Sequence, residues 1–121
     1  MTDRIELSNI RCYGYTGFLP EEQVLGQWFE VDLIIDLDLS QAGQSDDLQH
    51  TLDYRGAIEA TKTVVKDSRF ALVERLAAEI ASKILAFAIV QQVRVRLHKP
   101  AAPIPDFGGK ITIDITRQRN A

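Results

Sequence analysis

The segment Gln27 to Leu39 alternates apolar and acidic residues with a period of two. Side chains of a strand point to opposite faces in turn, so one face of this segment is apolar and the other is charged. The pattern predicts a long strand in a sheet that is buried on one face only. The apolar positions are Phe29, Val31, Leu33, Ile35, Leu37 and Leu39, and the acidic ones are Glu30, Asp32, Asp36 and Asp38.

Three further segments have strand patterning. Arg4 to Tyr15 alternates except at Ser8-Asn9, where a β-bulge would restore the period. Val90 to Leu97 alternates again, and residues 111–116 alternate isoleucine with polar residues after the turn at Gly108-Gly109. The prolines in the segment His98 to Pro105 exclude it from a sheet interior, because proline lacks the backbone donor that a ladder needs.

Two segments have helical periodicity. Phe70 to Leu85 repeats apolar residues at spacings of three and four, which predicts a core helix. Its buried face would hold Val73, Leu76, Ala77, Ile80 and Ile84. A second helix, capped by Asp53 or Thr51, has a stripe of Tyr54, Ala57, Ile58, Thr61, Val64 and Val65. Pro20 begins a short helix that ends near Gly26, and Ser40 to Thr51 is expected to be a loop with a helical turn near Gln41.

The order strand, strand, helix, helix, strand, strand predicts one α+β domain over residues 1–121, with a four-stranded antiparallel sheet and both helices on one face (ββααββ). Such an open sheet leaves two strand edges with unpaired backbone groups. Joining the sheets of several subunits into a β-barrel would remove both edges. Periodicity allows this assembly without requiring it.

Composition excludes several classes of protein. With a net charge of −3 and a pI near 5.3, the chain has no basic surface for nucleic acid or a membrane. Cys12 is the only cysteine, so no intrachain disulfide forms. The first residues lack the apolar core of a signal peptide, and we expect a cytoplasmic protein.

Several side chains that resemble known motifs are expected to be ordinary. The acidic and histidine residues of one loop lack a spacing that would bring them together on a metal, so no metal site is expected. They are Asp46, Asp47, His50 and Asp53. His98 is expected to be solvated or hydrogen-bonded, Cys12 to be packed, and Trp28 to lie in the core or an interface.

Four ionisable or phenolic residues lie at the ends of predicted elements, where binding sites are commonly built. Glu74 lies in the first turn of its helix, about 100° from the centre of the apolar stripe, where the free N–H groups favour an anion. The others are Glu22, Tyr54 and Lys99. Taken singly, each also has an ordinary explanation as a helix-start acid, a core-edge aromatic or a surface cation.

Five segments, taken in order and spacing, resemble the dihydroneopterin aldolase family over essentially the whole chain. They are Tyr13 to Gly17 with Leu19 to Glu22, Ser45 to Leu48, Thr51 to Tyr54, Leu72 to Ala77, and Lys99-Pro100 with Ala102 to Pro105. The resemblance implies the tunnelling fold, in which subunits form a barrel and two tetrameric rings stack into a homo-octamer. Active sites would then lie between neighbouring subunits.

The resemblance also implies residue roles. Glu74, with the backbone of Val73, would bind the 2-amino and ring N–H groups of a pterin. Tyr54, with Leu52 and Asp53, would come from the adjacent subunit. All three would bind the substrate, and Tyr54 would also be a catalytic residue.

Lys99 would donate and accept the proton, and Glu22 would bind the hydroxylated side chain and its water. Both would count as catalytic and as substrate-binding residues. Phe18, Val73 and Thr16 stand where the family varies, which affects pocket shape and no catalytic role.

The activity so implied is retro-aldol cleavage of 7,8-dihydroneopterin in folate synthesis, with 2′-epimerase activity as a companion reaction and without a metal or cofactor. Two alternatives stay open. An epimerase of dihydroneopterin or its triphosphate would share the fold and the pterin anchor, although Glu21-Glu22 disfavours a triphosphate. A non-catalytic pterin-binding protein would be expected to lack Lys99 or Tyr54, and both are present.

Overall fold

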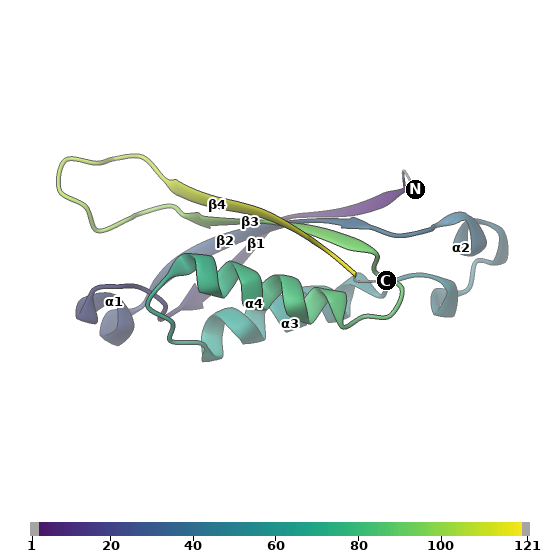
Figure 1. Cartoon of the computed structure of the whole chain (residues 1–121), viewed down its shortest axis with the longest axis horizontal. Coiled ribbons are helices and arrows are strands. Elements are labelled where there is room, and N and C mark those ends of the chain that lie inside the picture. The colour runs from purple at the N-terminus through teal and green to yellow at the C-terminus, as the bar shows by residue number, and fades with distance from the viewer. Residues whose placement is uncertain (1–2, 120–121) are drawn as a thin grey trace.

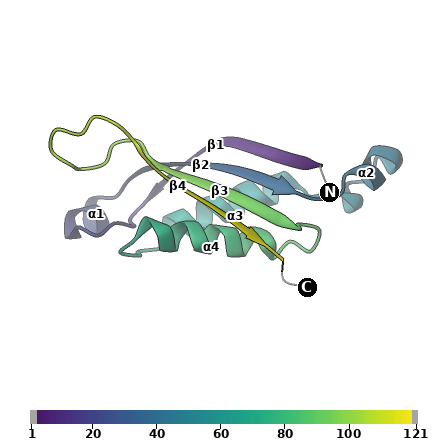
Figure 2. The same ribbon diagram turned by 45° about the horizontal axis from the view of Figure 1, so that its top comes forward.

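The computed structural model describes residues 3–119 and has two layers, a sheet and a pair of helices. Figure 1 and Figure 2 both show α3 and α4 side by side on one face of the sheet. The elements are β1 (Arg4–Gly14), α1 (Pro20–Leu25), β2 (Gln27–Asp36), α2 (Ser40–Ser45), a 3₁₀ turn η1 (Leu48–His50), α3 (Tyr54–Asp67), α4 (Val73–Leu85), β3 (Gln92–Lys99) and β4 (Ile111–Gln118). The predicted α+β class and helix placement are confirmed.

The sheet is antiparallel throughout, with the strand order β1-β2-β3-β4. Its register shifts between Leu7 and Ile10, and Asn9 there has a positive φ of 58°. The β-bulge predicted at Ser8-Asn9 is therefore confirmed, and asparagine is one of the residues that best tolerates this backbone conformation.

The core lies between the sheet and the two helices. The apolar face predicted from the alternation around β2 is buried. Its residues without exposed surface are Phe29, Val31, Leu33, Ile35 and Leu37. They belong to the same buried core as α4 residues such as Leu76, Ile80 and Ile84. Burial of this apolar surface is the main force that holds the helices to the sheet.

Two predicted boundaries are wrong. β2 ends at Asp36 rather than Leu39, because Asp36 is the last residue that pairs with both β1 and β3. α4 begins at Val73 rather than Phe70. The Phe70 carbonyl accepts from Gly17 N–H at 2.9 Å, and Phe70 N–H donates to the Thr16 hydroxyl at 3.2 Å. These contacts hold Phe70 outside the helix.

Three placements of single residues are also corrected. Tyr54 is 54% exposed, and the stripe of α3 is buried only from Ala57, where the helix packs on β1 and α4. Trp28 is 45% exposed, which excludes the core alternative. β3 extends through His98 to Lys99, since the prolines that end the strand begin only at residue 100.

Figure 1 shows α1 and the long loop between β3 and β4 at one end of the molecule, with α2 at the other. The start of α4 lies at the first end, and the start of α3 lies towards α2. Within residues 3–119, none of the helices has both the length and the apolar character needed to cross a bilayer.

Candidate active site

Lys99 and Glu22 form a direct ion pair. Lys99 Nζ donates to Glu22 Oε2 at 2.6 Å, and the two side chains are 12% and 8% exposed. Lys99 is the last residue of β3, and Glu22 lies in the first turn of α1, which starts at Pro20. The fold therefore joins two of the residues that the sequence singled out.

Both oxygens of the Glu22 carboxylate have further donors. Oε2 accepts from Gln27 Nε2 at 2.7 Å, and Oε1 accepts from the backbone N–H of Leu19 at 3.2 Å. Burial raises the pKa of Glu22, but the hydrogen bonds from Lys99, Gln27 and Leu19 outweigh burial and hold that pKa below its usual value. Glu22 is therefore an ionised group held in one orientation.

Gly17 makes room for this carboxylate. A Cβ placed on Gly17 would lie 2.5 Å from both Cβ and Cδ of Glu22, closer than carbon atoms approach without displacement. The same loop is tied to α1 because Gln23 Nε2 donates to the Gly17 carbonyl at 2.9 Å. Any residue larger than glycine here would move Glu22.

Gln27 is a site residue that the sequence analysis missed. The signal was present in the alternation, since Gln27 is in phase with Phe29 and Val31 and is the only polar residue on that face of β2. A polar residue at an inward-facing position normally has a buried partner. Here the partner is Glu22, at the edge of a cavity of about 140 Å³ that Pro103 also lines.

Glu74 lies in the first turn of α4, as predicted, and Val73 is the first residue of that helix. The Glu74 side chain is exposed, and within residues 3–119 it makes neither an ion pair nor a hydrogen bond. The segment just before α4 is connected to the loop that precedes α1, because Gly17 N–H donates to the Phe70 carbonyl. Thr16, which is fully buried, adds the hydroxyl contact to Phe70. Glu74 and Glu22 thus belong to one connected end of the molecule.

Leu52, Asp53 and Tyr54 lie at the opposite end of the helical layer. Asp53 caps α3 by accepting from Arg55 N–H at 3.1 Å, as one of the two predicted caps. All three line a hollow of about 350 Å³. Leu52 is only 3% exposed, so its side chain is part of the core. Tyr54 is the exposed member of the group.

A single chain therefore cannot bring Tyr54 to Lys99. The fourteen residues of α3 extend for about 20 Å, and Tyr54 is at the end remote from the start of α4. The Glu22–Lys99 contact and the start of α4, where Glu74 lies, are both at the other end. A site that uses both groups requires two copies of the chain.

The remaining candidate groups have packing or hydrogen-bonding roles. Burial raises the pKa of the Cys12 thiol to about 11, which leaves it a protonated side chain of the core. His50 bonds to the Ser45 hydroxyl at 2.6 Å, and His98 is buried and hydrogen-bonded. Among residues 3–119, no three or more His, Cys, Asp or Glu side chains are grouped as metal ligands.

Comparison with known proteins identifies the family. A family model described as dihydroneopterin aldolase matches residues 5–116. The chain belongs to the dihydroneopterin aldolase family. This confirms the resemblance inferred from the five sequence segments.

Relatives within the dihydroneopterin aldolase family match over nearly their whole length. A Synechocystis protein named probable dihydroneopterin aldolase is 50% identical over 97% of this chain and 99% of its own. The dihydroneopterin aldolase of Bacillus subtilis is 42% identical over 98% and 99%. The crystal structure of Escherichia coli dihydroneopterin aldolase in complex with neopterin has a TM-score of 0.87 at 30% identity, covering 96% and 99%.

Membership of the dihydroneopterin aldolase family confirms the fold class predicted from the sequence. The roles assigned to single residues stay predictions. What the geometry adds is the division of these residues into two groups. One contains Glu22, Lys99, Val73 and Glu74, and the other contains Leu52, Asp53 and Tyr54.

Proposed function

We propose that this chain cleaves 7,8-dihydroneopterin between C1′ and C2′, releasing glycolaldehyde and 6-hydroxymethyl-7,8-dihydropterin in folate synthesis. The observation that carries the proposal is the Lys99–Glu22 pair at 2.6 Å, largely shielded from solvent, in which Glu22 lines a cavity. The names of the relatives at 50% and 42% identity support the same reaction.

The reaction needs three chemical functions. A base must take the proton of the 2′-hydroxyl, an electron sink must accept the electrons of the breaking C1′–C2′ bond, and an acid must protonate C1′. The N5=C6 imine of the dihydropterin is the sink, so the enzyme needs no Schiff base of its own. The protein has to supply proton transfer and positioning.

Lys99 is assigned the proton transfers: its amine would take the proton of the 2′-hydroxyl, and the ammonium so formed would deliver a proton to C1′. Its Nζ lies at the end of β3 and is held by the ionised Glu22. Glu22 would also accept from the hydroxyl groups of the substrate side chain or from a water molecule. Its oxygens already have fixed donors, so its orientation is set before substrate arrives, which lowers the cost of ordering the site.

Glu74 is assigned the pterin ring. An ionised carboxylate has two acceptor oxygens in one plane, and the 2-amino group and the adjacent ring N–H offer two donors at matching spacing. The exposed Glu74 at the start of α4, with the backbone of Val73 beside it, is free to make this contact. The adjacent helix N-terminus stabilises the negative charge.

Assembly into a homo-octamer of two stacked rings is part of the proposal, with Tyr54, Leu52 and Asp53 supplied by a neighbouring subunit. Two observations support an assembly. The outer edges of β1 and β4 have no partner strand within residues 3–119. Large apolar side chains are exposed near the Glu22 end, including Phe18, Leu25, Leu72 and Ile104.

A cytoplasmic location is also proposed. It is supported by the use of one cysteine, which is buried and unpaired, as is usual in a reducing compartment.

The test is to incubate the purified protein with 7,8-dihydroneopterin and to separate the pterin products by chromatography. The proposal expects 6-hydroxymethyl-7,8-dihydropterin and glycolaldehyde in equal amounts, with the 2′-epimer as a minor product. Epimer without glycolaldehyde would identify an epimerase. Binding of the pterin with no product would identify a non-catalytic member of the family.

A further inference from the structure

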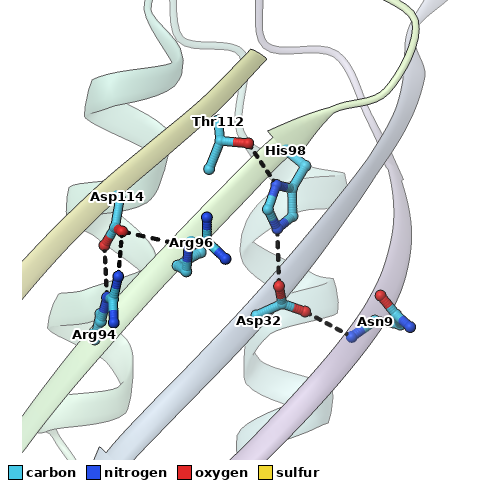
Figure 3. Close-up of polar contacts among 7 residues, drawn as sticks. All are labelled: Asn9, Asp32, Arg94, Arg96, His98, Thr112 and Asp114. Carbon is cyan, nitrogen blue, oxygen red and sulfur yellow. Dashed lines mark hydrogen bonds and ion pairs between the residues drawn. The ribbon is translucent and has the colours of Figure 1, made fainter. Parts of the chain in front are cut away.

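His98 joins three strands through its side chain on the open face of the sheet (Figure 3). Its Nε2–H donates to Asp32 Oδ2 of β2 at 2.9 Å, and its Nδ1 lies 2.7 Å from the Thr112 hydroxyl of β4. The residue is only 4% exposed, and both ring nitrogens have protein partners. We call His98, Asp32 and Thr112 the His98 brace.

Asp32 connects the brace to the fourth strand. Its Oδ1 accepts from the backbone N–H of Asn9 at 2.8 Å, at the bulge of β1. Burial raises the pKa of Asp32, but hydrogen bonds from Asn9 and His98 outweigh burial and hold that pKa below its usual value. An ionised Asp32 accepts from both donors, so hydrogen bonds cross all four strands at this level.

The brace lies at the last position where β3 has a neighbour on both sides. His98 pairs with Glu30 of β2 and with Thr112 of β4, whereas Lys99 pairs only with Ile111 of β4. Beyond Lys99 the chain enters the proline-containing loop of residues 100–110. The backbone of Lys99 is thus held on one side by β4 and, through the preceding residue, by the brace.

The Lys99 side chain points to the face opposite His98, because successive residues of a strand alternate. A shift of the end of β3 would therefore move the ammonium relative to Glu22, which is fixed separately by α1. We propose that His98 is a positioning residue that holds Lys99 against Glu22. The inference rests on the proposed function of Lys99 and adds a residue outside the substrate site.

The same face of β3 has a contact that serves as a control. Arg94 donates to Asp114 of β4 from Nε at 2.9 Å and from Nη2 at 2.6 Å (Figure 3). This pair also joins neighbouring strands, but it lies four residues before His98, about 13 Å along the strand. Its loss would cost cross-strand contacts without releasing the end of β3.

The first test compares His98→Leu, which fills the buried space without hydrogen bonds, with Arg94→Leu. His98→Leu is expected to lower kcat about tenfold, since small displacements of a catalytic group are costly, while the Kd of a non-reactive pterin changes less than about twofold. Arg94→Leu is expected to keep kcat within about twofold of wild type. His98→Gln, which retains a donor towards Asp32, should recover part of the loss.

A milder variant covers the case in which His98→Leu fails to fold. Thr112→Val preserves the shape of the side chain and removes only its hydroxyl. It is expected to lower kcat severalfold, again without a matching change in pterin Kd.

The second test does not depend on activity. Lys99 is 12% exposed, and trinitrobenzenesulfonate modifies lysines that are accessible and not held in ion pairs. Modification of Lys99, measured by peptide mass spectrometry on the intact assembly, should be several times faster in His98→Leu and in Thr112→Val than in wild type. It should be unchanged in Arg94→Leu.

Selective loss of kcat together with faster modification of Lys99 would support the inference. Unchanged kcat and unchanged modification in His98→Leu and Thr112→Val would overturn it, and so would equal effects in Arg94→Leu. If wild type does not cleave dihydroneopterin, the proposed function fails, and the modification rates alone then decide whether His98 holds Lys99.

Discussion

Lys99 and Glu22 are 77 positions apart in the chain, yet Lys99 Nζ lies 2.6 Å from Glu22 Oε2. The contact exists because β3 ends beside the first turn of α1, after the whole helical layer has been inserted between β2 and β3. The Lys99 ammonium is one of three donors that hold the pKa of Glu22 below its usual value, and Gln27 and Leu19 provide the others. The pair is therefore formed within one chain and does not need a second subunit.

Replacing Lys99 by alanine is expected to lower kcat by roughly a hundredfold or more, the scale of a lost general acid–base group. Pterin affinity should change much less, because the ring is assigned to Glu74. Single-turnover kinetics and titration with a non-reactive pterin separate the two effects. Lys83→Ala, an exposed lysine of α4, is the control. A large loss of affinity with normal turnover of bound substrate would remove Lys99 from the proton-transfer role.

The stability of the protein should depend on the charge of Glu22. The pKa of Glu22 is lowered in the folded state. The ionised carboxylate therefore stabilises the fold fully above the unfolded pKa of about 4.3. This stabilisation is lost as the pH falls through the lower pKa of the folded state. Glu22→Gln should therefore destabilise the protein by about 2 kcal/mol at pH 7. The difference should shrink below about pH 4 in urea unfolding at fixed protein concentration. A difference that is constant with pH would exclude this origin.

Gly17→Ala should disturb Glu22 directly. The added methyl group would lie 2.5 Å from two carbon atoms of Glu22 and force it to move. We expect a destabilisation of about 1–3 kcal/mol and a kcat reduced at least tenfold. Gly43→Ala in α2, where a Cβ meets nothing within 4 Å, is the matched control and should leave kcat unchanged. Equal activity in the two variants would contradict the role given to Gly17.

Glu74→Gln tests the pterin anchor. Glutamine presents one acceptor and one donor, so it loses a hydrogen bond and turns its amide N–H towards a ring N–H. The expected loss in affinity for a non-reactive pterin is on the order of 2–4 kcal/mol. If Glu74 serves only as an acid in the first helical turn, affinity stays constant and folding stability falls by about 0.3–1 kcal/mol. Calorimetric titration and thermal melting of the same sample distinguish the two.

Periodicity predicted most of the fold because each strong pattern corresponds to one buried face. The alternation around Phe29 fixed the orientation of β2, and the break at Ser8-Asn9 located the bulge. Boundaries were less accurate, since they depend on partners elsewhere in the chain. β2 ends at Asp36 because its pairing with Arg4 of β1 and with Gln92 of β3 ends there. Phe70 is held outside α4 by its contacts with Thr16 and Gly17.

The site was predicted as a set of residue types at element ends, and the contacts among them required the fold. No local pattern reveals that Lys99 contacts Glu22, or that Gln27 donates to the same carboxylate. The buried stripe predicted for α3 wrongly included Tyr54, because helical spacing alone does not show which part of a helix is covered by the rest of the fold.

The central claim is that one chain supplies Lys99 and Glu22 while its neighbour supplies Tyr54. It is tested most directly by mixing two inactive variants, Tyr54→Phe and Lys99→Ala, dissociating them together and allowing reassembly. Random association gives each site an intact Lys99 from one chain and an intact Tyr54 from the next in about one case in four. The account predicts that glycolaldehyde release recovers to roughly a quarter of the wild-type rate. Reassembled mixtures with no more activity than the separate variants would contradict it.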